Sequence, residues 1–243
     1  MTARRFTLDA SPFASLTGHG VRVAVIDSGV HPAHPHIGGA SVSGIRIAPD
    51  GEIDTDIVDR IGHGTAVAAA ILEKAPGIEL VVVRVFDRTL ATSGDVLARA
   101  ITWAAEHGAR LINLSLGTAN PARAERLGAV VDQAAAAGAI VVSARESAGV
   151  QWLPGSLPNV AAVTLDAACD RNALIATHDS SSGTVAFAAS GYPRPIPGVP
   201  VERNLSGISF AVANVTGFLA RLLEVDASVR DVSELARRLR RDS

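Results

Sequence analysis

Apolar residues follow two patterns along this chain, one typical of buried strands and one typical of helices. Runs rich in valine and isoleucine, such as residues 21–26 and 79–86, have the composition of strands covered on both faces. Residues 95–107 carry apolar side chains at the spacing of a helix with one buried face. Further strands are expected at residues 111–117, 139–143, 160–165 and 185–188, and further helices at residues 66–71, 121–137, 210–223 and 227–240. This alternation predicts an α/β fold with a doubly wound, mostly parallel sheet and helices on both faces.

One segment, residues 44–60, departs from the alternation of strands and helices. Its residues alternate between apolar and polar, and the Asp-Gly pair at 50–51 favours a tight turn, so we expect a hairpin there. The acids Asp54, Asp56 and Asp59 in the same segment are expected to be solvated loop residues.

The composition is that of a soluble globular protein. Of the 243 residues, 48% are hydrophobic and 19% are charged, which is enough apolar material for one sizeable core, so we expect a single domain over residues 1–243. The formal net charge is −2 and Lys74 is the sole lysine, so charge does not indicate a nucleic-acid or membrane surface. Cys169 is the sole cysteine, which excludes an intrachain disulfide.

The amino terminus contains basic residues but no apolar run long enough for a signal peptide. No other segment approaches the roughly 20 apolar residues that a membrane-spanning helix needs. On these grounds we expect a cytoplasmic protein with neither nucleic acid nor membrane as a partner.

Three residues with catalytic chemistry stand at the ends of predicted elements. Asp27 directly follows the strand at residues 21–26, and catalytic groups gather at the carboxyl edge of a parallel sheet. His63 lies between two glycines at the start of a helix, where another backbone has room to come close. Ser209 lies where an apolar helix begins, so its hydroxyl faces backbone N–H groups that lack partners within the helix. A serine there also serves as a helix cap, and only its combination with Asp27 and His63 favours catalysis.

The segments around these residues, Asp27-Ser-Gly29, Gly62-His-Gly-Thr65 and Gly207-Ile-Ser-Phe-Ala211, resemble those of the subtilisin-like serine peptidases. The order Asp, His, Ser along the chain is also that of the subtilisins. Each motif alone is a weak signal, but three in the expected order and context are a strong one, and the resemblance extends over about residues 20–223. It implies a subtilisin-like fold and a serine endopeptidase that needs no cofactor.

The resemblance also implies a role for individual residues. Ser209 is the nucleophile, His63 the general base and then acid, and Asp27 the group that orients the imidazole and stabilises it when protonated. Further candidates line a peptide-binding groove: Ser93, Gly94, Ser115, Leu116, Gly117, Ala144 and Glu146. The strand expected at residues 111–117 would pair with an extended peptide through main-chain hydrogen bonds. A turn and a helix cap explain Ser93 and Gly94 equally well.

The segment Ser143-Ala-Arg-Glu-Ser147 departs from the family, in which Ala-Ala-Gly-Asn is usual and the asparagine donates to the oxyanion. Aligned without gaps, Ser147 takes the place of the asparagine, and its hydroxyl offers one donor with a shorter reach. Arg145 is the second candidate for this role. Glu146 replaces a glycine in the wall that faces the residue before the scissile bond, which predicts a preference for a basic residue there. The alternative is that Glu146 pairs with Arg145 or faces solvent.

The histidines at positions 31, 34 and 36 are compatible with a metal site. Two prolines among them predict an extended turn instead, and no carboxylate or cysteine completes a ligand set. The chain also lacks the long loop that contributes to a calcium site in secreted members of the family. We therefore expect neither a metal nor a cofactor.

Two functions of different classes stay open at this stage. The first is restricted processing of a peptide or protein precursor inside the cell by an Asp-His-Ser triad, with a precursor peptide or an activating protein as partner. The second is a catalytically weak or inactive relative that keeps the groove and binds a peptide or protein, which the altered segment at 143–147 favours. A complete triad flanked by glycines is hard to explain in a binding module, so the enzyme is the leading hypothesis.

Overall fold

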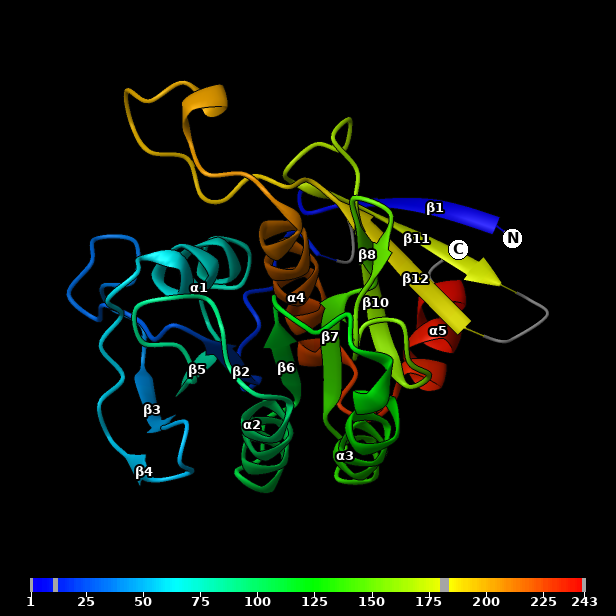
Figure 1. Cartoon of the computed structure of the whole chain (residues 1–243). Coiled ribbons are helices and arrows are strands. Elements are labelled where there is room, and N and C mark those ends of the chain that lie inside the picture. The colour runs from blue at the N-terminus through cyan, green and yellow to red at the C-terminus, as the bar shows by residue number, and fades with distance from the viewer. Residues whose placement is uncertain (1, 11–12, 180–183, 242–243) are drawn as a thin grey trace.

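The computed structural model describes residues 2–10, 13–179 and 184–241. Within them, ten strands form one sheet in the order β1-β11-β12-β10-β7-β6-β2-β5-β3-β4 (Figure 1). In chain order the strands are β1 (Thr2–Thr7), β2 (Arg22–Asp27), β3 (Val42–Ile47), β4 (Ile53–Asp54), β5 (Glu79–Arg84), β6 (Leu111–Leu114), β7 (Ile140–Ala144), β10 (Val160–Leu165), β11 (Ala173–Asp179) and β12 (Thr184–Ala189). Two short strands, β8 (Glu146–Ser147) and β9 (Val150–Gln151), form a separate hairpin.

The centre of the sheet is parallel and its edges are antiparallel. The strands from β12 to β3 run in one direction, whereas β11 and β1 at one edge and β4 at the other run against their neighbours. The predicted hairpin is confirmed, because β3 and β4 pair with Arg46 opposite Asp54. These two side chains form an ion pair of 2.6 Å, so Asp54 is partly solvated, as expected, but belongs to a strand instead of a loop. The mostly parallel α/β fold expected from the sequence is confirmed.

Helices cover both faces of the sheet. They are α1 (His63–Lys74), α2 (Gly94–Glu106), α3 (Ala124–Ala136), α4 (Ile208–Val225) and α5 (Val232–Arg241), with short 3₁₀ helices at Pro121–Arg123 and Val201–Arg203. Side chains of α1, α4 and α5 belong to one apolar core, and those of α2 and α3 to a second. Successive residues of β2 show the division, because Val23 and Val25 belong to the first core and Ala24 and Ile26 to the second.

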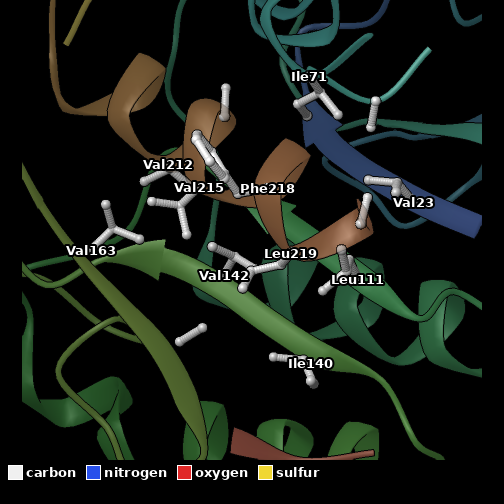
Figure 2. Packing of buried hydrophobic residues seen from close by; sticks show 14 of the residues in the cluster. Val23, Ile71, Leu111, Ile140, Val142, Val163, Val212, Val215, Phe218 and Leu219 are labelled. Atoms are coloured by element: carbon white, nitrogen blue, oxygen red, sulfur yellow. The ribbon is translucent and has the colours of Figure 1, made fainter. Parts of the chain in front are cut away.

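α4 is the central helix of the first core (Figure 1). Its residues Val212, Val215 and Phe218 lie among side chains of the sheet such as Val142 and Leu111 (Figure 2). By length and composition α4 would suffice to cross a membrane, which we did not expect of any segment. However, 78% of it is buried inside the protein, as is usual for a core helix.

Some elements differ from their predicted extents. β1 and β11, which pair with each other at one edge, were not expected. The last helix begins at Val232 rather than at residue 227, because Asp226 accepts hydrogen bonds from the backbone N–H and the hydroxyl of Ser228 and so forms a turn. β6 ends at Leu114, so residues 115–117 follow the strand instead of belonging to it.

Candidate active site

Asp27 is the last residue of β2 and is completely buried at the carboxyl edge of the sheet. Its Oδ1 accepts hydrogen bonds from the ring Nδ1 of His63 and from the backbone N–H of Ser28, each over 2.7 Å. Because a carboxylate only accepts hydrogen bonds, Nδ1 carries the proton and Nε2 is left as the basic nitrogen of His63.

The start of α1 brings His63 to Asp27. Gly64 permits this approach, since a Cβ on Gly64 would lie 2.2 Å from the carbonyl oxygen of Gly29 and 3.2 Å from the Cβ of Asp27. A larger residue would force α1 away from β2 and separate the two side chains. Close packing of α1 against the segment after β2 therefore explains why a glycine follows His63.

Opposing influences act on the pKa of His63. Burial disfavours the charged ring and lowers the pKa, but the hydrogen bond to Asp27 and the negative charges of Asp27 and Asp59 outweigh it. The pKa of His63 therefore lies above its ordinary value of 6.5. A ring that takes up a proton more readily is suited to act as a general base.

Asp59 ties the segment that follows Asp27 to the start of α1. One carboxylate oxygen accepts from the hydroxyl of Ser28 over 2.9 Å and from the backbone N–H groups of residues 61–62, and the other accepts from the N–H and hydroxyl of Thr65. Burial raises the pKa of Asp59, but these hydrogen bonds outweigh it and hold the pKa below 3.8. The expectation that Asp59 is a solvated loop residue is wrong, because its role depends on loops that meet only in the fold.

Ser209 is the second residue of α4 and is 8% exposed. Its hydroxyl donates to the carbonyl oxygen of Ser115 over 3.5 Å, and the hydroxyl of Ser115 donates to the carbonyl oxygen of Ser209 over 3.3 Å. The ring of the next residue, Phe210, has its centroid 5.9 Å from that of His63. Ser209 is therefore the chain neighbour of a residue whose ring packs near His63. Within the part of the chain that the structure describes, no hydrogen bond joins the Ser209 hydroxyl to His63.

A cavity of about 90 Å³ lies next to Ser209. Its lining is formed by Ser115, Leu116, Gly117, Ala144, Ser147, Trp152 and Ile208. The structure thus gathers four of the expected substrate-binding residues with Ser147, one of the two candidate oxyanion donors. Sequence reasoning missed Trp152, because no local pattern shows that the chain after β9 returns to pair Leu153 with Thr118.

The remaining candidates lie outside this cavity. Arg145 and Glu146 are exposed and do not line it, so the structure places no carboxylate in its wall. The predicted preference for a basic residue before the scissile bond depended on Glu146 in this wall, so the structure does not support it. Ser93 caps α2 by accepting a hydrogen bond from the backbone N–H of Val96 over 3.2 Å, and Gly94 is the first residue of that helix. This cap is the alternative that the sequence left open for Ser93 and Gly94.

The histidines between β2 and β3 form no metal site with carboxylates or cysteine in the described ranges. Across residues 2–10, 13–179 and 184–241, no group of three or more His, Cys, Asp or Glu side chains is placed to hold a metal ion. His34 and His36 contact each other edge to face, with ring centroids 5.1 Å apart. With His31 they line a second, larger cavity.

Comparison with known proteins identifies the family. The model of the Subtilase family matches residues 18–240. Subtilisin E of Bacillus subtilis (strain 168) is 31% identical over 242 residues, a match that covers 88% of this chain and 60% of subtilisin E. Since the family match spans most of the chain, the chain belongs to the subtilase family.

Solved structures agree with this assignment. The protease domain of PatA is 27% identical and superposes with a TM-score of 0.69, covering 91% of this chain and 87% of that one. The prenylagaramide maturation protease PagA is 24% identical with a TM-score of 0.66, covering 89% of this chain and 81% of that one. The expected subtilisin-like fold is confirmed.

Proposed function

We propose that this chain is a serine endopeptidase that uses Ser209, His63 and Asp27. The observation that carries the proposal is the 2.7 Å contact between Asp27 and His63, made beside a buried serine at the start of a helix and beside a cavity for a side chain. Membership of the subtilase family supports it.

In the proposed reaction the Ser209 hydroxyl turns from Ser115 toward His63 and attacks the carbonyl carbon of a peptide bond, while its proton passes to Nε2 of His63. Asp27 stabilises the imidazolium through Nδ1. The carbonyl oxygen becomes an anion near the unpaired backbone N–H groups at the start of α4. His63 then protonates the leaving amine as the C–N bond breaks. Water, activated by the same imidazole, releases the acyl group from Ser209.

Labelling with a fluorophosphonate tests the triad directly. The reagent should modify Ser209 of the purified chain, whereas Ser209→Ala should not react and His63→Ala should react far more slowly, because the nucleophile then lacks its base. A folded protein that is not labelled, alone or with candidate partners, would count against the proposal.

Ser147 is the proposed second donor to the oxyanion, because it lines the cavity beside Ser209. Ser147→Ala should lower kcat and leave KM nearly unchanged, since the hydrogen bond strengthens only in the transition state. Losing one such donor costs on the order of 10²-fold to 10³-fold, a range measured in a subtilisin. Ser147→Asn should keep or raise kcat. An unchanged kcat in Ser147→Ala with a large loss in Arg145→Ala would move the role to Arg145.

For the substrate we propose a peptide or protein precursor that is cut at few sites inside the cell. The small cavity supports this, because it restricts the side chain that can enter. One structural neighbour is a maturation protease, a role stated for that protein, and at 24% identity its likeness concerns the fold. Profiling the cleavage of a diverse peptide library should give a few preferred sequences. Cleavage at most peptide bonds would contradict restricted processing.

A second function is favoured by one observation, the Ser209 hydroxyl directed at Ser115 instead of at His63. In that case the chain is a catalytically weak relative that binds a peptide or protein in its groove. Turnover of the peptide library separates the two functions. If Ser209→Ala abolishes turnover, the chain is an enzyme, whereas unchanged binding without any turnover by either protein identifies a binding module.

A further inference from the structure

A second cavity, of about 660 Å³, lies outside the site described above. Its walls are the loop at residues 31–36, one face of α1, and the segment at residues 193–205. Each wall lies close in sequence to one residue of the proposed triad. The loop follows Asp27, α1 begins at His63, and the third segment leads to Ser209. The cavity therefore lies at the same edge of the sheet as the triad.

The order of the strands separates the two cavities along the carboxyl edge of the sheet. The small cavity is built from residues that follow β6 and end β7, whereas the large one is built from the loop after β2 and from α1. In the sheet β6 lies between β7 and β2. A peptide that places its acyl side in the small cavity therefore continues past Ser209 and His63 toward the large cavity.

The lining of the large cavity is mainly apolar. α1 contributes Ala66 and Ala69, whose short side chains leave the space open, and the opposite wall contributes Ile196 and Leu205. Ile196 and Leu205 are 46% and 55% exposed, an unfavourable exposure that a bound apolar group would remove. Asp59 also reaches the lining, but the hydrogen bonds at the start of α1 already occupy its carboxylate.

The basic groups around the cavity do not give it the character of an anion site. Burial, the charge of Arg194 and the neighbouring His34 lower the pKa of His36 from its ordinary value of 6.5, which disfavours a positive charge on this ring. The guanidinium of Arg194 donates to the carbonyl oxygen of His36 over 3.2 Å and so joins two walls. Asn204 donates to the carbonyl oxygen of Arg194 over 3.2 Å. What the cavity offers a ligand is therefore apolar and aromatic surface.

We infer that the large cavity binds a large aliphatic or aromatic side chain of the substrate, carried on the leaving-group side of the scissile bond. This inference rests on the proposed function and names a second determinant of its specificity. Burial of such a side chain is favourable in proportion to the apolar area removed from water. The proposed site thus selects substrate residues in two ways. The residue before the scissile bond must be small, and a residue after the bond must be apolar.

Two series of peptide substrates test the inference. In the short series a chromogenic amine directly follows the scissile bond. In the long series four residues follow the bond, and each of these four positions is in turn leucine or alanine. Leucine at one or more of these positions should raise kcat/KM by about tenfold or more over alanine. Ala66→Phe, which fills the cavity, should abolish this gain. The short series does not reach the cavity, so its rate in each protein is the reference against which the gain from leucine is measured.

A matched pair of variants separates the cavity from the segment that forms its wall. Ile196→Ser should reduce the gain from leucine, because Ile196 lines the cavity. Val199→Ser should leave the gain unchanged, because Val199 lies on the same segment, is 39% exposed and is not part of the lining.

Three results would overturn the inference. If leucine and alanine give equal rates at every position, the inference is wrong. Cleavage of the short series in the same experiment would still support the proposed function. No cleavage of either series, together with no fluorophosphonate labelling, would reject the proposed function and the inference with it. A wild-type dimer in solution that becomes a monomer in Ile196→Ser would show that the cavity holds a second copy of the chain.

Discussion

At the scale of single residues, the pKa of His63 sets how the proposed activity depends on pH. The imidazole accepts the proton of Ser209 only when neutral, and its pKa lies above 6.5, so kcat/KM should fall as the pH is lowered through a midpoint above 6.5. Asp27→Asn removes the negative charge, so the midpoint should move to lower pH and turnover should drop by on the order of 10⁴-fold. The pH profiles of both proteins check this. An unmoved midpoint in Asp27→Asn would contradict it.

Trp152 is expected to limit the size of a substrate side chain in the small cavity, because it is one of the residues that line a volume of only about 90 Å³. The wild-type chain should therefore cleave after small residues such as alanine in preference to phenylalanine. Trp152→Ala should raise the ratio of kcat/KM for phenylalanine over alanine by about tenfold or more, in line with the discrimination of apolar pockets. Gln151→Ala is the control, because Gln151 is exposed and outside the lining. An unchanged ratio in Trp152→Ala would remove Trp152 as the limit.

The candidate site could be predicted from sequence where local context identifies a residue. Asp27, His63 and Ser209 each stand at the end of an element with a clear apolar pattern, and the structure places all three at one edge of the sheet. Trp152 and Asp59 could not be found in this way. Each acts through a loop that meets distant parts of the chain, and nothing in the neighbouring residues shows where that loop will lie.

At the scale of elements, the contact between α1 and α4 depends on Gly217. A Cβ on Gly217 would lie 2.5 Å from the Cβ of Lys74, so Gly217→Ala should destabilise the protein by about 1–3 kcal/mol through overcrowding. Gly128→Ala in α3 is the matched control, because a Cβ there meets no atom within 4 Å. It should stabilise by up to about 1 kcal/mol, since alanine favours the helix. Urea unfolding of both variants measures whether the free energy of unfolding falls in Gly217→Ala and rises in Gly128→Ala. Equal changes in the two variants would contradict the crowding argument.

Elements with a long apolar pattern were predictable, whereas those fixed by distant pairing were not. α2 spans Gly94–Glu106 against the predicted residues 95–107, and β10 spans the predicted residues 160–165. β1 contains Arg4 and Arg5 and buries little of its surface, so its sequence shows no strand pattern. It forms because β11 offers a free edge, and that partner is supplied by a remote part of the chain.

At the scale of the whole molecule, carboxylates that join separate segments make stability depend on pH. Asp56 is a partly exposed loop residue that also pairs with the buried Arg84, and its pKa is lowered to about 2, chiefly by its hydrogen bond to Arg60. The pKa of Asp59 is lowered as well. Between the ordinary value of 3.8 and these lower values the unfolded chain binds more protons than the folded one, so stability falls as the pH is lowered.

The free energy of unfolding should therefore decrease as the pH is lowered from about 4 to 2, and urea unfolding over this range measures it. Asp59→Asn should be less stable at pH 7 by about 1–3 kcal/mol, because Ser28 and Thr65 lose a charged acceptor. The same variant should also show a weaker dependence on pH. Parallel curves for the two proteins would show that Asp59 does not contribute to the acid sensitivity.

Helix α4 also determines when the proposed catalytic arrangement can exist as the chain is synthesised. It carries Ser209, it is the centre of the first core, and its Phe218 contacts the ring of Phe13 at 5.8 Å between centroids. Residues made early are thus held by a helix made late, a contact of high sequence separation that forms slowly. A ribosome-bound chain that ends before α4 contains Asp27 and His63 but not Ser209, the proposed nucleophile. The topology therefore delays the proposed hydrolysis until nearly the whole described chain has emerged.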